Sequence, residues 1–201
     1  MKNIVFISLA LLISATVYSQ TAESLLKEGL AIDSTGNHMK AVKKFDKAIL
    51  LKPDYAEAYR ARAMCKLHTR EHRSSMADIT HAIELKPDYA EAYLDRAQIK
   101  NQLEDYRGEI QDLNKAIELR PDYAIAYNER GLIRGRLDDH QGEIADYTKA
   151  ISLKPNFGEA YHNRAHARYI IGDKEGACLD FSKAGEYGYF KSYEDIKDMC
   201  R

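Results

Sequence analysis

The sequence lacks an excess of charge of either sign, because Lys and Arg total 30 against 31 Asp and Glu. The two signs alternate without a block of like charge, which argues against a nucleic-acid-binding surface and against a polyanionic tail. Hydrophobic residues make up 45% and charged residues 30% of the 201 residues, a composition that excludes a disordered or fibrous protein. We therefore expect a globular domain with no nucleic-acid partner.

The sequence also lacks the short motifs that mark catalytic and cofactor sites. It contains no Walker or Rossmann glycine motif, no GxSxG, no HExxH and no CxxC. No nucleophile, base and orienting residue can be proposed as a set. We therefore expect a protein that is not an enzyme, with no cofactor and no small-molecule substrate.

Only one long hydrophobic run occurs, from Ile4 to Val17, and it follows Lys2. Its 14 residues fall short of the roughly 20 that a membrane-spanning helix needs. A basic start, an apolar middle and small residues before Gln20 are typical of a secretory signal peptide. We predict that residues 1–19 are a signal peptide, removed after about Ser19, with an uncleaved N-terminal anchor as the alternative. The mature protein would be periplasmic or secreted, without stable membrane insertion.

All four prolines stand 34 residues apart (87−53, 121−87 and 155−121), at Pro53, Pro87, Pro121 and Pro155. The string LKPDYAEAY surrounds the first two prolines, and the looser copies LRPDYAIAY and LKPNFGEAY surround the others. A fixed period of this size indicates stacked repeats. Five units follow from it: 22–55, 56–89, 90–123, 124–157 and 158–191.

Inside each unit the same kinds of residue recur at the same places. The eighth place is small (Gly29, Ala63, Ala97, Gly131, Ala165) and the twenty-fourth is aromatic or apolar (Phe45, Ile79, Leu113, Tyr147, Phe181). The twenty-seventh place is always Ala. Apolar residues at helical spacing, such as Val42, Phe45 and Ile49, indicate a helix. A turn-forming segment in the middle of a unit separates this stretch from the one before it. Each unit is therefore expected to be two helices.

This pattern resembles the tetratricopeptide repeat (TPR) family, whose small eighth, aromatic or apolar twenty-fourth, Ala twenty-seventh and Pro thirty-second positions are matched in four or five copies. The resemblance implies an all-α, right-handed α-solenoid of five helix-turn-helix units, with residues 192–201 as a C-terminal capping helix. It also implies a protein-interaction scaffold that binds a protein or peptide partner in a concave groove. The alternative is a structural spacer or self-associating element of a cell-envelope assembly.

The resemblance also implies which residues face the groove, at the second, fifth, ninth and twelfth places of each unit. The partner-binding candidates are Leu26, Arg60, Met64, Leu94, Gln98, Asn128, Leu132, His162, His166 and Tyr169. Relatives that bind chaperone tails hold a carboxylate with Lys, Asn and Arg at the fifth and ninth places, and only Arg60 and Asn128 match here. We therefore expect an extended or helical peptide in the groove rather than a small anion.

Charged residues recur in pairs that lie 16 residues apart. The pairs are Arg62 and Asp78, Arg96 and Asp112, Arg130 and Asp146, and Arg164 and Asp180, with the signs reversed in Glu28 and Lys44. A joint change of sign predicts an ion pair across each helix hairpin, and a ligand-binding row of Arg is the alternative. The twentieth place, small in the family, is Glu109 and Glu143 in two units. We expect Lys100 and Arg134 to neutralise these carboxylates.

Histidine and cysteine provide the remaining candidates. His162 and His166 have the spacing of two metal ligands on one helix, but no third ligand is evident, so no metal is expected. Cys178, in the fifth unit, and Cys200, on the inward face of the C-terminal helix, are predicted to form a disulfide that joins this helix to the fifth unit. An oxidising compartment would allow the bond to form. Cys65 is left as a free thiol. Two reduced, buried cysteines are the alternative.

Overall fold

The computed structural model describes residues 20–200, and the predicted signal peptide lies outside them. The described residues form eleven α-helices and no strand. The helices are α1 (Ala22–Asp33), α2 (His38–Leu51), α3 (Ala56–His68), α4 (His72–Leu85), α5 (Ala90–Gln102), α6 (Tyr106–Leu119), α7 (Ala124–Arg136), α8 (His140–Leu153), α9 (Gly158–Ile170), α10 (Lys174–Glu186) and α11 (Ser192–Met199). The predicted all-α solenoid of helix pairs is confirmed.

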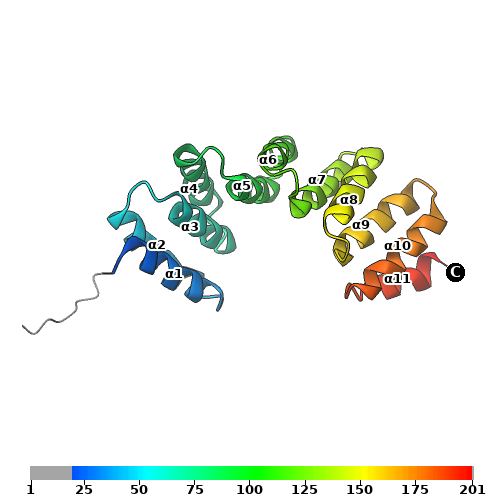
Figure 1. Cartoon of the computed structure of the whole chain (residues 1–201), viewed down its shortest axis with the longest axis horizontal. Helices are drawn as coiled ribbons and strands as arrows, with labels where there is room; N and C mark the ends of the chain where they lie inside the picture. The colour runs from blue at the N-terminus through cyan, green and yellow to red at the C-terminus, as the bar shows by residue number, and fades with distance from the viewer. Residues whose placement is uncertain (1–19, 201) are drawn as a thin grey trace, which may run out of the picture.

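The helix pairs follow one another along an arch, with α1 at one end and α11 at the other (Figure 1). Each odd-numbered helix from α1 to α9 packs mainly against the even-numbered helix that follows it, and each even-numbered helix from α2 to α8 then packs against the next odd-numbered helix. α11 packs on α10. Each helix among residues 20–200 is too short or too polar to cross a membrane.

The core of the arch is a row of small and large side chains that meet between paired helices. Buried clusters combine Ala63 with Ile79, and Ala97 with Leu113. At Gly131 an added Cβ would lie only 2.7 Å from the ring of Tyr147. The small eighth place therefore sets how closely the two helices of a unit approach, since a larger residue would overlap the twenty-fourth side chain.

The repeated LKPDYAEAY string is the joint between consecutive units. In each of the first four units a cation lies over the aromatic ring three residues later, 4.4–4.6 Å from its centroid: Lys52 over Tyr55, Lys86 over Tyr89, Arg120 over Tyr123 and Lys154 over Phe157. In the first three units the cation also reaches back to a Glu on the first helix of its own unit, as Lys86 does to Glu57 at 3.2 Å. These contacts fix the turn between units and explain the repetition.

The turn inside each unit places its fifteenth residue in the left-handed backbone region. Glycine holds this place in the first and fifth units, as Gly36 and Gly172, with φ of 80° and 88°. Arg70, Glu104 and Asp138 hold it in the other three, with φ of 59° to 63°. A side chain with a Cβ is strained there, whereas glycine is not.

We expect Glu104→Gly to raise the free energy of unfolding by about 0.5–1 kcal/mol. Glycine relieves the strain of the left-handed backbone conformation, and this gain exceeds the loss that comes from the greater entropy of glycine in the unfolded chain. Glu104 is exposed, so no packing is lost. Urea unfolding checks the gain. The matched control is Glu118→Gly inside α6, where glycine should destabilise by a similar amount; equal effects at both positions would contradict the strain.

Candidate partner-binding groove

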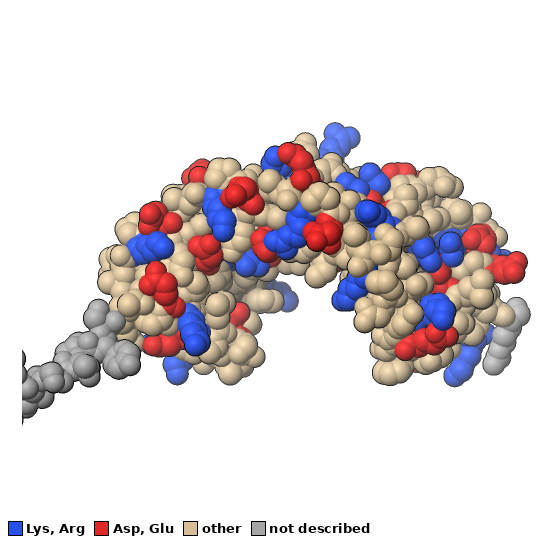
Figure 2. Space-filling model, viewed as in Figure 1, with Lys and Arg blue, Asp and Glu red and all other residues tan. Residues whose placement is uncertain are grey.

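The inner side of the arch contains a pocket of about 720 Å³ that spans three consecutive units. Figure 2 shows the arch hollowed on this side, with charges of both signs spread over its surface. The lining residues come from α3, α5 and α7, with additions from the turn and the second helices: Leu67, His68, Arg70, His72, Gln98, Asn101, Gln102, Glu109, Glu129, Leu132, Ile133 and Arg136. We call this surface the central groove.

Two of the candidates from the sequence, Gln98 and Leu132, line the central groove. Leu94 is only 6% exposed and packs with Ala97 and Leu113, and Asn128 is fully buried. Asn128 accepts a hydrogen bond at 3.2 Å from Asn163 of the next unit. Leu94 and Asn128 therefore serve the packing of the solenoid, since a partner could not reach them without unfolding.

Arg60 is also engaged inside the solenoid. Its Nε donates a hydrogen bond at 2.5 Å to Asp95 of the next unit, and its guanidinium lies over the ring of Tyr89. The carboxyl of Asp95 is almost completely buried, so loss of Arg60 would leave a buried charge unpaired. Leu26 and Met64 are only partly buried, and the pocket lining includes neither of them.

Of the three candidates of the fifth unit, His162 and Tyr169 pack against the C-terminal helix, whereas the side chain of His166 is 37% exposed. His162 is buried, and its Nδ1 lies 3.0 Å from Ser192 Oγ and 3.4 Å from Asp195 Oδ2 of α11. Tyr169 packs in a cluster that includes Ile196 and Met199 of the same helix. Burial, and then the neighbouring His166, lower the pKa of His162 to about 4, so its ring is neutral at pH 7. This end of the inner side is closed by the chain itself.

The carboxylates at the twentieth place have partners other than those predicted. Lys100 contacts Asp112 at 2.7 Å and the Gly108 carbonyl, not Glu109. Arg134 likewise contacts Asp146, whereas Glu143 lies 3.0 Å from His140 Nδ1. The predicted pairing of Lys100 and Arg134 with the two glutamates is therefore wrong. It fails because an Asp three residues further along the same helix draws each cation away.

Glu109 is a buried carboxyl that lines the central groove and is 3% exposed. Asn101 donates from its side-chain amide to both carboxyl oxygens, at 3.1 and 3.0 Å. Burial raises the pKa of Glu109 to about 7, although the Asn101 hydrogen bond and the positive charge of Arg136 oppose the rise. Burial, together with the nearby Glu159, also raises the pKa of Glu129 in the same groove. The groove therefore presents carboxyl groups whose ionised form would be stabilised by a hydrogen-bond donor or a cation from a partner.

We expect Glu109→Gln to flatten the dependence of stability on pH. The pKa of Glu109 is near 4.5 in the unfolded chain and about 7 in the folded one, so its stabilising contribution is complete below pH 4.5 and is lost as pH rises through 7. At pH 8 the variant should be more stable than the wild type by on the order of 2 kcal/mol. Urea unfolding at pH 5 and pH 8 measures the difference, with exposed Glu104→Gln as control.

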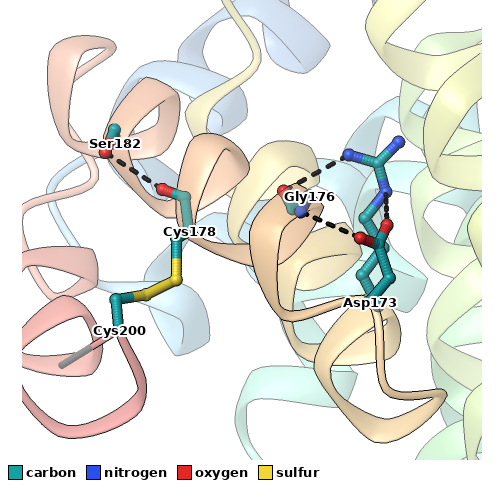
Figure 3. The surroundings of a disulfide bond; sticks show 6 residues. Asp173, Gly176, Cys178, Ser182 and Cys200 are labelled. Atoms are coloured by element: carbon teal, nitrogen blue, oxygen red, sulfur yellow. Dashed lines mark hydrogen bonds and ion pairs between the residues drawn. A yellow bond between two sulfur atoms is a disulfide. The ribbon is translucent and has the colours of Figure 1, made fainter.

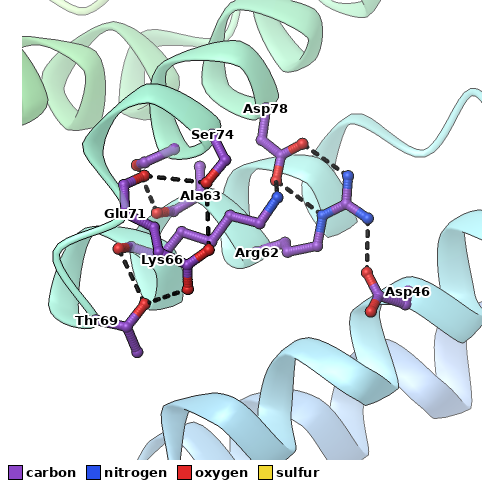
Figure 4. Close-up of polar contacts among 9 residues, drawn as sticks. Asp46, Arg62, Ala63, Lys66, Thr69, Glu71, Ser74 and Asp78 are labelled. Atoms are coloured by element: carbon purple, nitrogen blue, oxygen red, sulfur yellow. Dashed lines mark hydrogen bonds and ion pairs between the residues drawn. The ribbon is translucent and has the colours of Figure 1, made fainter.

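The predicted ion pairs across the helix hairpins are confirmed. Arg62 donates from Nε and Nη2 to both oxygens of Asp78, at 2.8 and 2.7 Å, and Lys66 contacts the same carboxylate at 2.7 Å (Figure 4). The same two-bond geometry recurs in the next three units. In the first unit Lys44 contacts Glu28 at 2.5 Å. The row of Arg is therefore occupied by Asp and is no free anion site.

A second cation on each of these Asp residues was missed in the sequence. It stands at the eleventh place and is Lys66, Lys100, Arg134 and Arg168 in the second to fifth units, 2.7–3.0 Å from the carboxylate. The first unit, whose twenty-third place is Lys44, has Ile32 there. The signal was present in the sequence, since the eleventh place loses its charge where the acid is absent.

The sulfur atoms of Cys178 and Cys200 form a disulfide that joins α10 to the end of α11 (Figure 3). Their Cα atoms are 5.8 Å apart, within the range that an unstrained bridge needs. Cys65 is a free, buried thiol whose Sγ donates to Asp33 at 3.0 Å. Burial raises the pKa of the Cys65 thiol, which keeps it protonated.

A family model described as tetratricopeptide repeat matches residues 90–123 and 124–157, which are the third and fourth units. A search of curated proteins found no significant match. The crystal structure of MamA has 25% sequence identity and a TM-score of 0.71, over 82% of this chain and 96% of MamA.

Two further solved structures share the fold at lower sequence identity. The structure of Pseudomonas aeruginosa pilF has a TM-score of 0.79 and 18% identity, over 83% of this chain and 76% of pilF. The structure of YrrB, described as a TPR protein with an unusual peptide-binding site, has a TM-score of 0.68 and 15% identity, over 88% of this chain and 92% of YrrB. These likenesses support the repeat architecture across nearly all of the described chain.

Proposed function

We propose that this chain, whose third and fourth units match the tetratricopeptide-repeat family model, is a non-enzymatic scaffold that binds a segment of a partner protein in the central groove. The observation that carries this proposal is the pocket of about 720 Å³ shared by three consecutive units. A site built across several units suits an extended or helical peptide, which contacts many side chains at once. YrrB, which shares this fold, is described as having an unusual peptide-binding site.

The lining residues suggest the chemistry of the bound segment. Leu132, Ile133 and Leu67 offer apolar contacts, whereas Gln98, Asn101 and Gln102 offer amides that pair with a peptide backbone. The carboxyls of Glu109 and Glu129 are raised in pKa by burial and gain from a donor. A segment with an apolar residue and a Lys or Arg side chain or backbone N–H groups would satisfy both kinds of surface.

We propose further that the protein acts outside the cytoplasm. The pattern of residues 1–19 supports this, because it is typical of a secretory signal peptide. The Cys178–Cys200 disulfide supports it as well, since disulfides persist in oxidising compartments. Mass spectrometry of the protein purified from its own cells tests the proposal: a chain that begins near Gln20 supports export, and an intact N-terminus contradicts it.

Photo-crosslinking in the native cells tests the groove. A benzophenone amino acid replaces Gln102, which lines the central groove, or Gln111, an exposed residue of α6 that does not. We expect a covalent adduct with another protein from position 102 and none from position 111. Adducts with a second copy of this chain, or none from position 102, would favour the structural spacer.

Affinity measurements with the crosslinked partner complete the test. The variant Gln102→Lys places a positive charge in the groove, and Gln111→Lys makes the same change at an exposed position of α6. We expect the groove variant to bind the partner at least tenfold more weakly, a loss of about 1.4 kcal/mol, because the new lysine repels the Lys or Arg of the partner and competes with it for the groove carboxyls. Equal affinities for the two variants would contradict binding in the central groove. Variants of Leu94 or Arg60 are unsuitable, because both residues hold the solenoid together.

A further inference from the structure

A cluster of two histidines and one aspartate lies where α11 covers the fifth unit. His162 and His166 stand one turn apart on α9, and Asp195 comes from α11. Asp195 Oδ2 is 3.4 Å from His162 Nδ1 and 3.8 Å from His166 Nε2. The three potential ligand atoms all lie within 4.8 Å of one another. The third ligand that the sequence did not reveal is thus supplied by the capping helix.

The spacing of these three atoms fits a transition-metal ion after a small contraction. Zinc binds imidazole nitrogen and carboxylate oxygen at about 2.0–2.2 Å, so tetrahedral ligands lie roughly 3.3 Å apart. The distance from His162 to Asp195 is already of this size. His166 Nε2 lies 3.8 Å from Asp195 Oδ2 and would have to approach it by about 0.5 Å. The side chain of His166 is 37% exposed.

The polar groups of the cluster are incompletely satisfied without a ligand. Asp195 Oδ2 is buried and has no hydrogen-bond partner among the described residues. Imidazole nitrogens of His162 and His166 lie 3.4 and 3.8 Å from this oxygen, yet neither donates a hydrogen bond to it. A buried carboxylate oxygen without a donor is costly. Ser192 Oγ, 3.0 Å from His162 Nδ1, makes a competing contact that a metal would replace.

We propose that His162, His166 and Asp195 bind a divalent transition-metal ion of the zinc type, with a water molecule at the fourth position. Imidazole and carboxylate ligands suit such ions, and histidines four residues apart on a helix place both rings on one face. The metal joins α9 to α11, and the Cys178–Cys200 disulfide joins α10 to the same helix. The end of the solenoid is thus fastened twice, by a redox-sensitive link and by a metal-dependent one.

Calorimetric titration of the purified protein with ZnCl₂ tests the site, together with thermal unfolding in the presence of zinc or a chelator. We expect binding of one ion per chain and a higher melting temperature with zinc. Asp195→Asn, which keeps the shape of the side chain, and His166→Ala should each weaken binding more than about tenfold, as even second-shell changes often do. The controls are Glu194→Gln, an exposed acid beside Asp195, and His81→Ala in α4, and both should bind zinc like the wild type.

Three results would overturn the proposal. The first is absence of zinc binding by the folded wild type. The second is unchanged affinity in Asp195→Asn and His166→Ala. The third is loss of binding in Cys65→Ala alone, which would place the ion at the cluster of Asp33, His38 and Cys65. Circular dichroism establishes that each variant is folded, and His166→Gln replaces His166→Ala if the latter unfolds.

Discussion

Asp112→Asn is expected to lower the free energy of unfolding by about 3 kcal/mol, because it leaves two cations facing each other in a largely buried site. Asp112 is 3% exposed. It accepts hydrogen bonds from Arg96 at 2.9 and 2.6 Å and contacts Lys100 at 2.7 Å. Urea unfolding measures the loss. Asp122→Asn, an exposed acid in the turn after α6, is the control and should change stability by less than about 0.5 kcal/mol.

Reversing the charges of Arg96 and Asp112 tests how the second cation, Lys100, contributes to stability. Arg96→Glu with Asp112→Lys restores the direct pair, but Lys100 then faces the new lysine, so we expect only partial recovery. Adding Lys100→Ile reproduces the first unit, in which Glu28, Ile32 and Lys44 occupy these places. The triple variant should be more stable than the double variant by about 1 kcal/mol or more. If it is less stable, Lys100 does not act through its charge.

The fold could be predicted because its determinants are local and repeated. A period of 34 residues, small eighth places and large twenty-fourth places require only neighbouring residues on two helices, and five copies of the pattern reinforce one another. The ion pairs could be predicted for a different reason. The swap to Glu28 and Lys44 changes both signs together, and this covariation inside one chain points to direct contact.

The residues of the groove were harder to predict. Their spacing on a helix shows which side of the helix they lie on, but it does not show whether the next unit covers them. Leu94 and Gln98 lie on the same face of α5, yet the next unit covers Leu94 while Gln98 lines the pocket. Which residue is covered depends on how consecutive pairs pack, as in the contact of Arg60 with Asp95, 35 positions away. The spacing of residues within one unit does not reveal a contact between residues of two different units.

The carboxylates and the capping helix show a second limit. Lys100 lies within reach of Glu109 along the chain, but Asp112 competes for it and already holds Arg96. Proximity on paired helices therefore does not decide a partner when two acids compete for one cation. Similarly, Asp195 meets His162 and His166 only because α11 turns back onto the fifth unit. The sequence predicted that helix but not which of its side chains would reach α9.

Removal of the Cys178–Cys200 disulfide, by Cys178→Ser with Cys200→Ser, is expected to destabilise the C-terminal end by roughly 3 kcal/mol. The bridge closes a loop with a sequence separation of 22, and the chain-entropy model gives a value of this size for such a loop. α11 has only eight residues, too few for a helix that is stable alone, so it should detach first. Hydrogen exchange should show faster exchange in α11 and little change in α5 and α6.

Thiol counting on the denatured, non-reduced protein from its native compartment tests whether the bridge forms there. We expect one free thiol, that of Cys65, which is buried in the folded chain and becomes accessible on denaturation. Recombinant protein that has been fully reduced provides the reference of three thiols. Three thiols in the native sample would show that the cysteines pack without bonding. In that case the double serine variant should unfold at nearly the same urea concentration as the wild type, since no loop is closed in either.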